Sequence, residues 1–380
     1  MNNKAGQKAA KLENRAIGVL QLVALGILSL VVYKNFVSVP LLDVVFGISS
    51  LLLLIAILLV LGKEVTKHEG VLLFILLLLF WYAQLVSQKG ALVFYVDVAY
   101  PLLGYSLALL LVHTRWNRHL VRLFCYVALA PFLYGFLIKG IRLTNGSNFY
   151  IMNRNTIPKL LVMSCAFLLM AEHEREEGTY SLLIPFLTVL VCFFSRSRAG
   201  LLIAGALFFM VIVRTLISHS AGIRSLMGKH RWTFLLLLTA IALALGFGVL
   251  YAYSNSRLVA QGLSSNGRVQ IYMAFLHELT LKRILIGYRP EILNGIGLHN
   301  SYLNLLAHFG LLSLLFFFMY TKALLGFLRN SFMFTGLLVL WGVYSLVESL
   351  SPFAVGDLLI IPLLMLSMQY GKDINAVVGK

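Results

Sequence analysis

The stretch LLDVVFGISSLLLLIAILLVLG, which runs from Leu41 to Gly62, is apolar at nearly every position. A helix rises about 1.5 Å per residue, so a helix of this length can cross a hydrocarbon core about 30 Å thick. Similar runs recur along the chain. Hydrophobic residues make up 60% of its 380 residues and charged residues only 12%, whereas a soluble domain averages about 25% charged. The composition therefore predicts an integral membrane protein.

The apolar runs predict the fold class, which is all-α and polytopic. They are long and unbroken, unlike the short alternating segments of a membrane β-barrel. We expect about twelve transmembrane helices and one membrane domain, residues 1–380, because no repeat or nucleotide-binding glycine motif divides the chain. The first run is expected to be a retained span rather than a cleaved signal. The predicted spans lie near residues 16–36, 41–62, 71–88, 92–112, 120–139, 157–171, 180–195, 200–217, 233–253, 301–324, 331–347 and 357–371.

The distribution of charge predicts the orientation of the spans. A basic N-terminus and basic loops at 114–122 and 214–231 favour cytoplasmic positions, and an even number of spans returns the C-terminus to the cytoplasm. The chain carries a net charge of +17, and its predicted external loops also hold more Lys and Arg than Asp and Glu. This excess indicates either an anionic substrate on the external face or basic side chains that reach lipid phosphates. The longest predicted external loop, 254–300, lies between the ninth and tenth spans, and loops of this length are usually functional.

Two arginines stand at the predicted external end of the seventh span, in CFFSRSRAGLL. Arg196 and Arg198 are two residues apart, and on a helix they would point about 200° away from each other, so one site is not expected to use both. Ala199 and Gly200 follow Arg198 and allow a helix or a substrate to approach closely. We therefore assign Arg198 to the site, with Arg196 as a supporting residue and the alternative choice.

The stretch SSNGRVQIYMAFLHELT, residues 264–280, predicts a capped amphipathic helix within the long external loop. Arg268 stands in its first turn, where a positive charge opposes the helix dipole. An external anion is a reasonable partner for this arginine, and an exposed surface arginine is the alternative. The predicted apolar face consists of Val269, Tyr272, Met273 and Leu276.

Polar residues also run through GIGLHNSYLNLLAHFG, residues 295–310, at the start of the tenth span. His299 precedes the span, and Asn300 can cap its helix. Asn304 and His308 follow Asn300 at intervals of four residues, so these three side chains share one helical face. Polar groups facing lipid are costly, and we therefore expect this stripe to face a cavity or other polar helices.

The last external loop, SLVESLSPFAVGD, contributes two acids, Glu348 and Asp357. Glu348 is expected to pair with the arginines, and an acid–base role is the alternative. Alternation of the spans places Arg198, Arg268, His299 and Glu348 on one membrane face, although they come from three separate connections, with Arg268 and His299 both in the loop 254–300. Cys125, Cys165 and Cys192 fall within spans and are expected to be core residues, with no disulfide and no metal site.

Taken together, three stretches resemble the O-antigen polymerase and O-antigen ligase superfamily. They are SRSRAGLL at 195–202, NGRVQIYMAFLHELTLKRILIGY at 266–288 and LHNSYLNLLAHFGLL at 298–312. In that family, a serine-arginine pair opens one span, a glycine-arginine helix begins the large periplasmic loop, and a His-Asn pair precedes a span with a glycine about ten residues later. All three features occur here in the family's order.

The resemblance implies a GT-C-type glycosyltransferase of the bacterial inner membrane that needs neither a metal nor a cofactor. Its donor would be an undecaprenyl-diphosphate-linked glycan, and its partners would not include nucleic acid. Arg198 and Arg268 would bind the diphosphate on the periplasmic face. His299 would take the proton from the acceptor hydroxyl, with inversion at the anomeric carbon.

The acceptor distinguishes the two activities that the resemblance implies. A polymerase extends another lipid-linked repeat unit, whereas a ligase transfers the glycan to lipid A core. The ligase pattern resembles His-Asn, nine residues, Gly, two residues, then Gly, Thr or Tyr, and here Ser313 occupies the last place. We therefore favour the polymerase. A lipid-linked oligosaccharide flippase or transporter is the alternative from another class, although no inverted repeat is visible.

Overall fold

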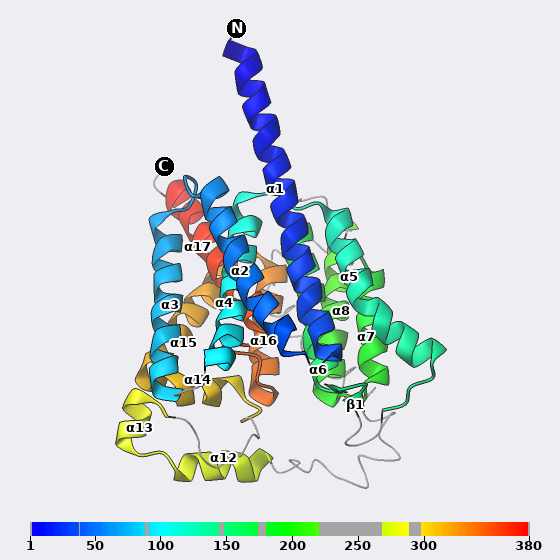
Figure 1. Ribbon diagram of the computed structural model, residues 1–380, viewed down its shortest axis with the longest axis vertical. Coiled ribbons are helices and arrows are strands. Elements are labelled where there is room, and N and C mark those ends of the chain that lie inside the picture. The colour runs from blue at the N-terminus through cyan, green and yellow to red at the C-terminus, as the bar shows by residue number, and fades with distance from the viewer. Residues whose placement is uncertain are drawn as a thin grey trace.

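A computed structural model describes residues 2–37, 39–87, 91–143, 148–173, 180–219, 268–288 and 298–378. Within these ranges the chain is almost entirely helical, with a single two-stranded hairpin (Figure 1). This architecture confirms the all-α class predicted from the apolar runs. The ninth predicted span, 233–253, lies outside the described residues, as do 289–297 of the long loop.

The first half of the described chain forms the following elements. They are α1 Asn2–Tyr33, η1 Lys34–Phe36, α2 Pro40–Leu61, α3 Lys67–Ser87, α4 Ala91–His113, α5 Arg118–Leu133, the π-helical turn η2 Tyr134–Ile138, β1 Asn148–Phe149, β2 Met152–Asn153, α6 Thr156–His173, α7 Leu183–Phe194 and α8 Arg198–His219. The second half comprises α12 Arg268–His277, α13 Leu281–Ile286, α14 Ser301–Phe309, η4 Gly310–Leu312, α15 Ser313–Asn330, α16 Phe332–Val347 and α17 Asp357–Val378.

Seven candidate membrane spans, long and apolar enough to cross a bilayer, are found among the described residues. Shorter apolar helices lie at 97–113, 183–194, 332–347 and 357–369. Every predicted span that falls on described residues coincides with one of these helices. The chain is therefore a mostly helical membrane protein.

The predicted span 301–324 is interrupted, contrary to the uninterrupted helix expected from its hydropathy. Gly310 adopts a φ of +52° at the end of α14, and a short 3-10 turn leads from it into α15. Such a φ is open to glycine because it lacks a Cβ atom. The apolar run continues through the break, so hydropathy alone could not detect it.

The helix at the centre of the bundle is α4, whose second half is buried on all sides. From Leu102 to Leu111 its side chains are at most 7% exposed. It packs against α2 and α17, and Gly104 permits the second of these contacts: a Cβ atom there would lie 2.7 Å from the Asp357 carbonyl oxygen. A helix that is apolar all round is the form expected for a fully surrounded span.

Chain direction alternates between two ends of the bundle (Figure 1). The N- and C-termini mark one end, while α12, α13 and the β1–β2 hairpin mark the other. We call the latter the hairpin end. At the terminal end, Arg122 forms an ion pair with Glu172, and the Ser331 hydroxyl lies 3.2 Å from Nε2 of His173.

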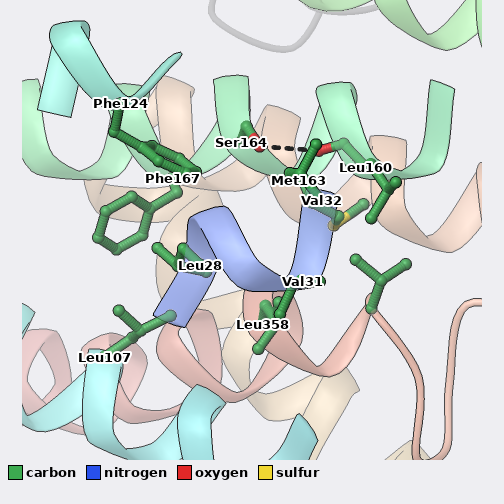
Figure 2. Close-up of a pocket in the computed structure, with 11 residues that line it drawn as sticks. Leu28, Val31, Val32, Leu107, Phe124, Leu160, Met163, Ser164, Phe167 and Leu358 are labelled. Atoms are coloured by element: carbon green, nitrogen blue, oxygen red, sulfur yellow. Dashed lines mark hydrogen bonds between the residues drawn. The ribbon is translucent and has the colours of Figure 1, made fainter. Parts of the chain in front are cut away.

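One void in the bundle core is too small for a substrate. It lies among α1, α4, α5, α6 and α17 and has a volume of about 10 Å³ (Figure 2). The only polar side chain on its wall is Ser164, whose hydroxyl donates to the Leu160 carbonyl at 2.9 Å. A space of this size holds at most about one water molecule. The three cysteines are free and buried, as predicted for core residues.

Candidate functional site

The two arginines of the SRSR motif flank a tight turn between α7 and α8. Arg196 lies outside both helices, with a φ of +55°, and its backbone N–H donates to the Phe193 carbonyl. Ser197 is buried, and its hydroxyl accepts from the Gly200 N–H at 3.3 Å, which caps the first turn of α8. Arg198 is the first residue of that helix and is exposed. The prediction that helical spacing separates the two arginines was therefore wrong, because only Arg198 is helical.

The start of α8 packs tightly against the start of α6. A Cβ atom on Gly200 would overlap the ring of Pro158, so only glycine fits this approach. The close approach predicted after Arg198 is therefore made by a helix of the same chain. It places the turn that carries Arg198 beside Pro158 and its neighbour, Lys159.

Lys159 holds the predicted acid Glu348 in a buried ion pair. The Lys159 Nζ atom lies 2.8 Å from Oε2 of Glu348, and the two side chains are 16% and 2% exposed. Glu348 was expected to pair with the predicted arginines, whereas the cation in this ion pair is Lys159, which was not among the predicted site residues. Removing two charges from water is costly unless they pair closely. The ion pair therefore fixes the end of α16 against the first turn of α6.

Ser301, which sequence reasoning missed, joins Glu348 to the start of α14. Its buried hydroxyl donates to the Glu348 carbonyl at 2.9 Å and accepts from the Leu350 N–H at 2.8 Å. Asn300 caps the helix as predicted: its side-chain oxygen accepts from the N–H groups of Tyr302 and Leu303. The local sequence gave no signal of this role, because the partners of Ser301 lie 47 and 49 residues further along the chain.

The polar stripe lies against the connection between α16 and α17. The Asn300 amide donates to the Leu346 carbonyl at 3.0 Å, and the Asn304 amide donates to the Ser349 hydroxyl at 2.9 Å. His308 continues the stripe, with Nδ1 2.8 Å from the Asn304 carbonyl. Asn300 and Asn304 therefore contact polar groups of α16 and of the connection after it, whereas the His308 contact lies within α14.

His299 is held in an unusual backbone conformation between two anchored neighbours. Its φ is +49°, in the left-handed region that few residues other than glycine enter. Leu298 on one side is buried in a small apolar cluster, and Asn300 on the other side caps α14. The His299 carbonyl accepts from the Tyr272 hydroxyl at 3.3 Å. The histidine backbone is thus fixed from α12 as well as from α14.

The helix α12 confirms the predicted helix after Gly267, but a different face packs against the protein. Phe275 is 1% exposed and stacks on Tyr288, whereas Met273 and Leu276 of the predicted apolar face are 50% and 51% exposed. Arg268 is the first residue of α12, one turn before Tyr272. The predicted capping residues 264–266 lie outside the described residues.

Tyr288 connects α13 to α14. Its N–H donates to the Ala307 carbonyl at 2.7 Å, and its hydroxyl donates to the Phe275 carbonyl at 3.3 Å. The pKa of Tyr288 is raised to about 12, mainly by burial and also by the nearby Glu278 charge, whereas the Arg283 charge acts to lower it. The phenol therefore stays protonated at neutral pH and remains a donor.

A chain of contacts joins the elements that carry the predicted residues. From the Arg198 turn it passes through Gly200 and Pro158 to Lys159 and Glu348. It continues through Ser301 to Asn300 and His299, and through Tyr272 to the helix that begins at Arg268. These elements gather at the hairpin end. In the part of the chain that the structure describes, no group of three His, Cys, Asp or Glu residues could hold a metal ion.

The fold defines a mostly helical membrane protein with polar and charged residues gathered at one end. Comparisons with known protein families, with curated proteins and with solved structures found no match to this chain.

Proposed function

We propose that this protein is a GT-C-type membrane glycosyltransferase with about twelve spans and a site on the periplasmic face of the bacterial inner membrane. It would join an undecaprenyl-diphosphate-linked glycan to a sugar hydroxyl, as an O-antigen or capsule repeat-unit polymerase. The observation that carries the proposal is the chain of contacts from the Arg198 turn through Glu348 to His299 and α12. It links all three motifs that resemble the family.

The proposed reaction assigns a role to each group. The acceptor hydroxyl attacks the anomeric carbon, the bond from that carbon to the diphosphate oxygen breaks, and the configuration inverts. His299 takes the hydroxyl proton. Arg198 and Arg268 stabilise the negative charge on the leaving diphosphate, since guanidinium groups match phosphate oxygens in geometry and charge. The Glu348 side chain pairs with Lys159 on α6, and its backbone carbonyl accepts from Ser301 on α14. Glu348 therefore acts as a positioning residue that holds the end of α16 against both helices.

A transfer assay with purified protein in proteoliposomes tests the proposal. Lipid-linked repeat units are supplied with and without lipid A core. A ladder of products without the core supports the polymerase. Capped core without a ladder would identify a ligase instead, and movement of the lipid-linked unit across the bilayer with no new linkage would identify a transporter.

Substitutions at the site distinguish catalysis from binding elsewhere. His299→Ala, Arg198→Ala and Arg268→Ala should each lower transfer by about 100-fold or more, the scale of losing a general base or a charge-stabilising donor. Arg115→Ala and His119→Ala provide matched controls, because both residues are exposed and lie near the terminal end. Normal transfer by His299→Ala or Arg198→Ala would refute the enzyme assignment.

A further inference from the structure

A polar cleft of about 440 Å³ opens at the hairpin end, beside the candidate site. One wall is the connection from α1 to α2, with Lys34, Asn35 and Asp43, and the other is formed by the hairpin and the start of α6, with Asn153 and Thr156. Its volume falls within the range of roughly 300–1,000 Å³ that small-molecule ligands occupy. None of these residues belongs to the motifs that resemble a family.

The charges in the cleft neutralise each other. The Lys34 Nζ atom lies 2.8 Å from Oδ1 of Asp43, and the same ammonium lies 4.5 Å from the ring centroid of Phe46. The Lys34 ammonium also lies 5.2 Å from the ring centroid of Tyr100, and its side chain is only 8% exposed. A paired cation gives an anion little net attraction. The cleft therefore suits a neutral polar ligand better than a phosphate.

Other polar groups on the walls retain hydrogen-bonding capacity. The Asn35 amide donates to the Val31 carbonyl at 2.7 Å, which leaves its oxygen as an acceptor. The Asn153 oxygen accepts from the Asn155 N–H at 2.9 Å, which leaves its NH₂ group as a donor. The Thr156 hydroxyl can both donate and accept. Half-exposed Val37 and Ile151 add apolar surface. Hydroxyl groups and C–H faces of a sugar match this combination.

Aromatic packing holds the two walls in place. Phe149 of the hairpin is fully buried, and its ring centroid lies 6.0 Å from that of Phe36 on the first wall and 5.4 Å from that of Phe132 on α5. Tyr150 also contacts Phe36, with centroids 6.3 Å apart. A cleft whose walls are fixed before binding loses less entropy when a ligand enters.

The first turn of α6 connects the cleft to the candidate site. Thr156 lines the cleft, and Lys159 pairs with Glu348 only about 4.5 Å further along the helix axis. We propose that the cleft binds neutral sugar residues of the glycan substrate, close to the linkage that is formed. This proposal rests on the proposed glycosyltransferase function and adds a glycan subsite formed by Asn35, Asn153 and Thr156.

The test measures binding and transfer separately. The probe is the repeat-unit oligosaccharide released from its lipid carrier and freed of phosphate, titrated into the purified full-length protein. Asn35→Ala and Thr156→Val each remove one hydrogen-bonding group. Each should weaken oligosaccharide binding by about 3- to 10-fold, the effect of one hydrogen bond. KM should rise by a similar factor while kcat changes little, because neither residue touches the reacting atoms.

Asn330→Ala provides the matched control. Its amide donates to the Gly326 carbonyl four residues earlier, at 2.9 Å, just as the Asn35 amide bonds to Val31. Asn330 precedes Ser331, which contacts His173 at the far end of α6 from Thr156. This variant should bind and transfer as the unmodified protein does.

Two failures can be told apart. If the unmodified protein forms glycosidic linkages but the Asn35→Ala and Thr156→Val variants keep its KM and its oligosaccharide affinity, the cleft proposal is overturned and the proposed function stands. If the unmodified protein forms no linkage yet binds the oligosaccharide, and the two variants weaken that binding, the glycan subsite is upheld and the glycosyltransferase function is refuted.

Discussion

The backbones of Gly287 and Gly310 lie directly against each other, and neither residue has room for a Cβ atom. A Cβ atom on Gly310 would lie 2.5 Å from the Gly287 nitrogen, and one on Gly287 would lie 2.7 Å from the Ala307 carbonyl oxygen. Both residues have positive φ angles, of +85° and +52°. Tyr82 on α3 adds a hydrogen bond from its hydroxyl to the Ile286 carbonyl at 2.6 Å. The end of α13 is thus docked at the break between α14 and α15.

Substitution of Gly310 should disturb the placement of α12 and α13. Gly310→Ala places a Cβ atom at a φ of +52° and a ψ of −131°, a backbone conformation that is sparsely populated by residues other than glycine and costs roughly 1–3 kcal/mol, and it adds a clash with the Gly287 backbone. Because α12 fixes His299 through Tyr272, we expect transfer to fall by about 10- to 100-fold, the effect of a small misplacement at a reacting centre. The transfer assay measures this loss, and thermal unfolding in detergent measures the change in stability.

Gly326→Ala is the control for that prediction. Gly326 lies within α15, and no atom lies within 4 Å of a Cβ built there. Alanine should therefore be neutral, or stabilising by roughly 0.5–1 kcal/mol, because it lowers the entropy cost of forming a helix. Equal loss of activity in both variants would contradict the docking role of Gly310.

The ion pair between Lys159 and Glu348 gives a second prediction. Lys159→Met removes the ion-pair partner of the buried Glu348 carboxylate, which should lower the free energy of unfolding by roughly 3–5 kcal/mol. The double variant Lys159→Met with Glu348→Gln removes both charges and should recover much of this loss. Unfolding in mixed micelles measures the free energy of unfolding of the single and the double variant. A double variant no more stable than Lys159→Met would show that the buried charge of Glu348 is not the cause.

The sequence alone predicted the helical class and the positions of the spans, because runs of apolar residues have a length that the bilayer fixes. It also predicted the Asn300 cap and the polar direction of the stripe, since both follow from local periodicity. These features depend on residues a few positions apart. The sequence signal for them is therefore strong.

Contacts between distant segments could not be predicted in this way. Lys159 and Glu348 are 189 residues apart, and hydropathy does not indicate which cation meets which acid. The helix breaks at Gly310, where the backbone of Gly287 from another segment packs against it. Likewise, the face that α12 buries is decided by Tyr288 and Leu298, which form its apolar cluster with Phe275. Hydrophobic periodicity within the helix does not contain that information.

The direction of the polar stripe gives a third prediction. Asn304→Leu removes the hydrogen bond to the Ser349 hydroxyl, and it should lower stability by roughly 0.5–1.5 kcal/mol. If Asn304 faced lipid, leucine would be favourable there. Leu314→Ala is the control, since Leu314 on α15 is 58% exposed and is packed only loosely against the rest of the protein. Thermal unfolding of the two variants in the same detergent compares them, and a stabilised Asn304→Leu protein would contradict the observed orientation.

The hydrogen bond from Tyr272 to the His299 carbonyl gives the last prediction. Tyr272→Phe keeps the ring but removes the donor that helps to hold His299 at its φ of +49°. Loss of one hydrogen bond should lower kcat by about 3- to 10-fold and leave substrate KM nearly unchanged, because the hydroxyl contacts the histidine backbone and not the glycan. Tyr126→Phe is the control, at a tyrosine that is 38% exposed on α5. If Tyr272→Phe transferred glycan as fast as Tyr126→Phe, the conformation of His299 would not depend on α12, and the proposed role of that helix in positioning the base would be wrong.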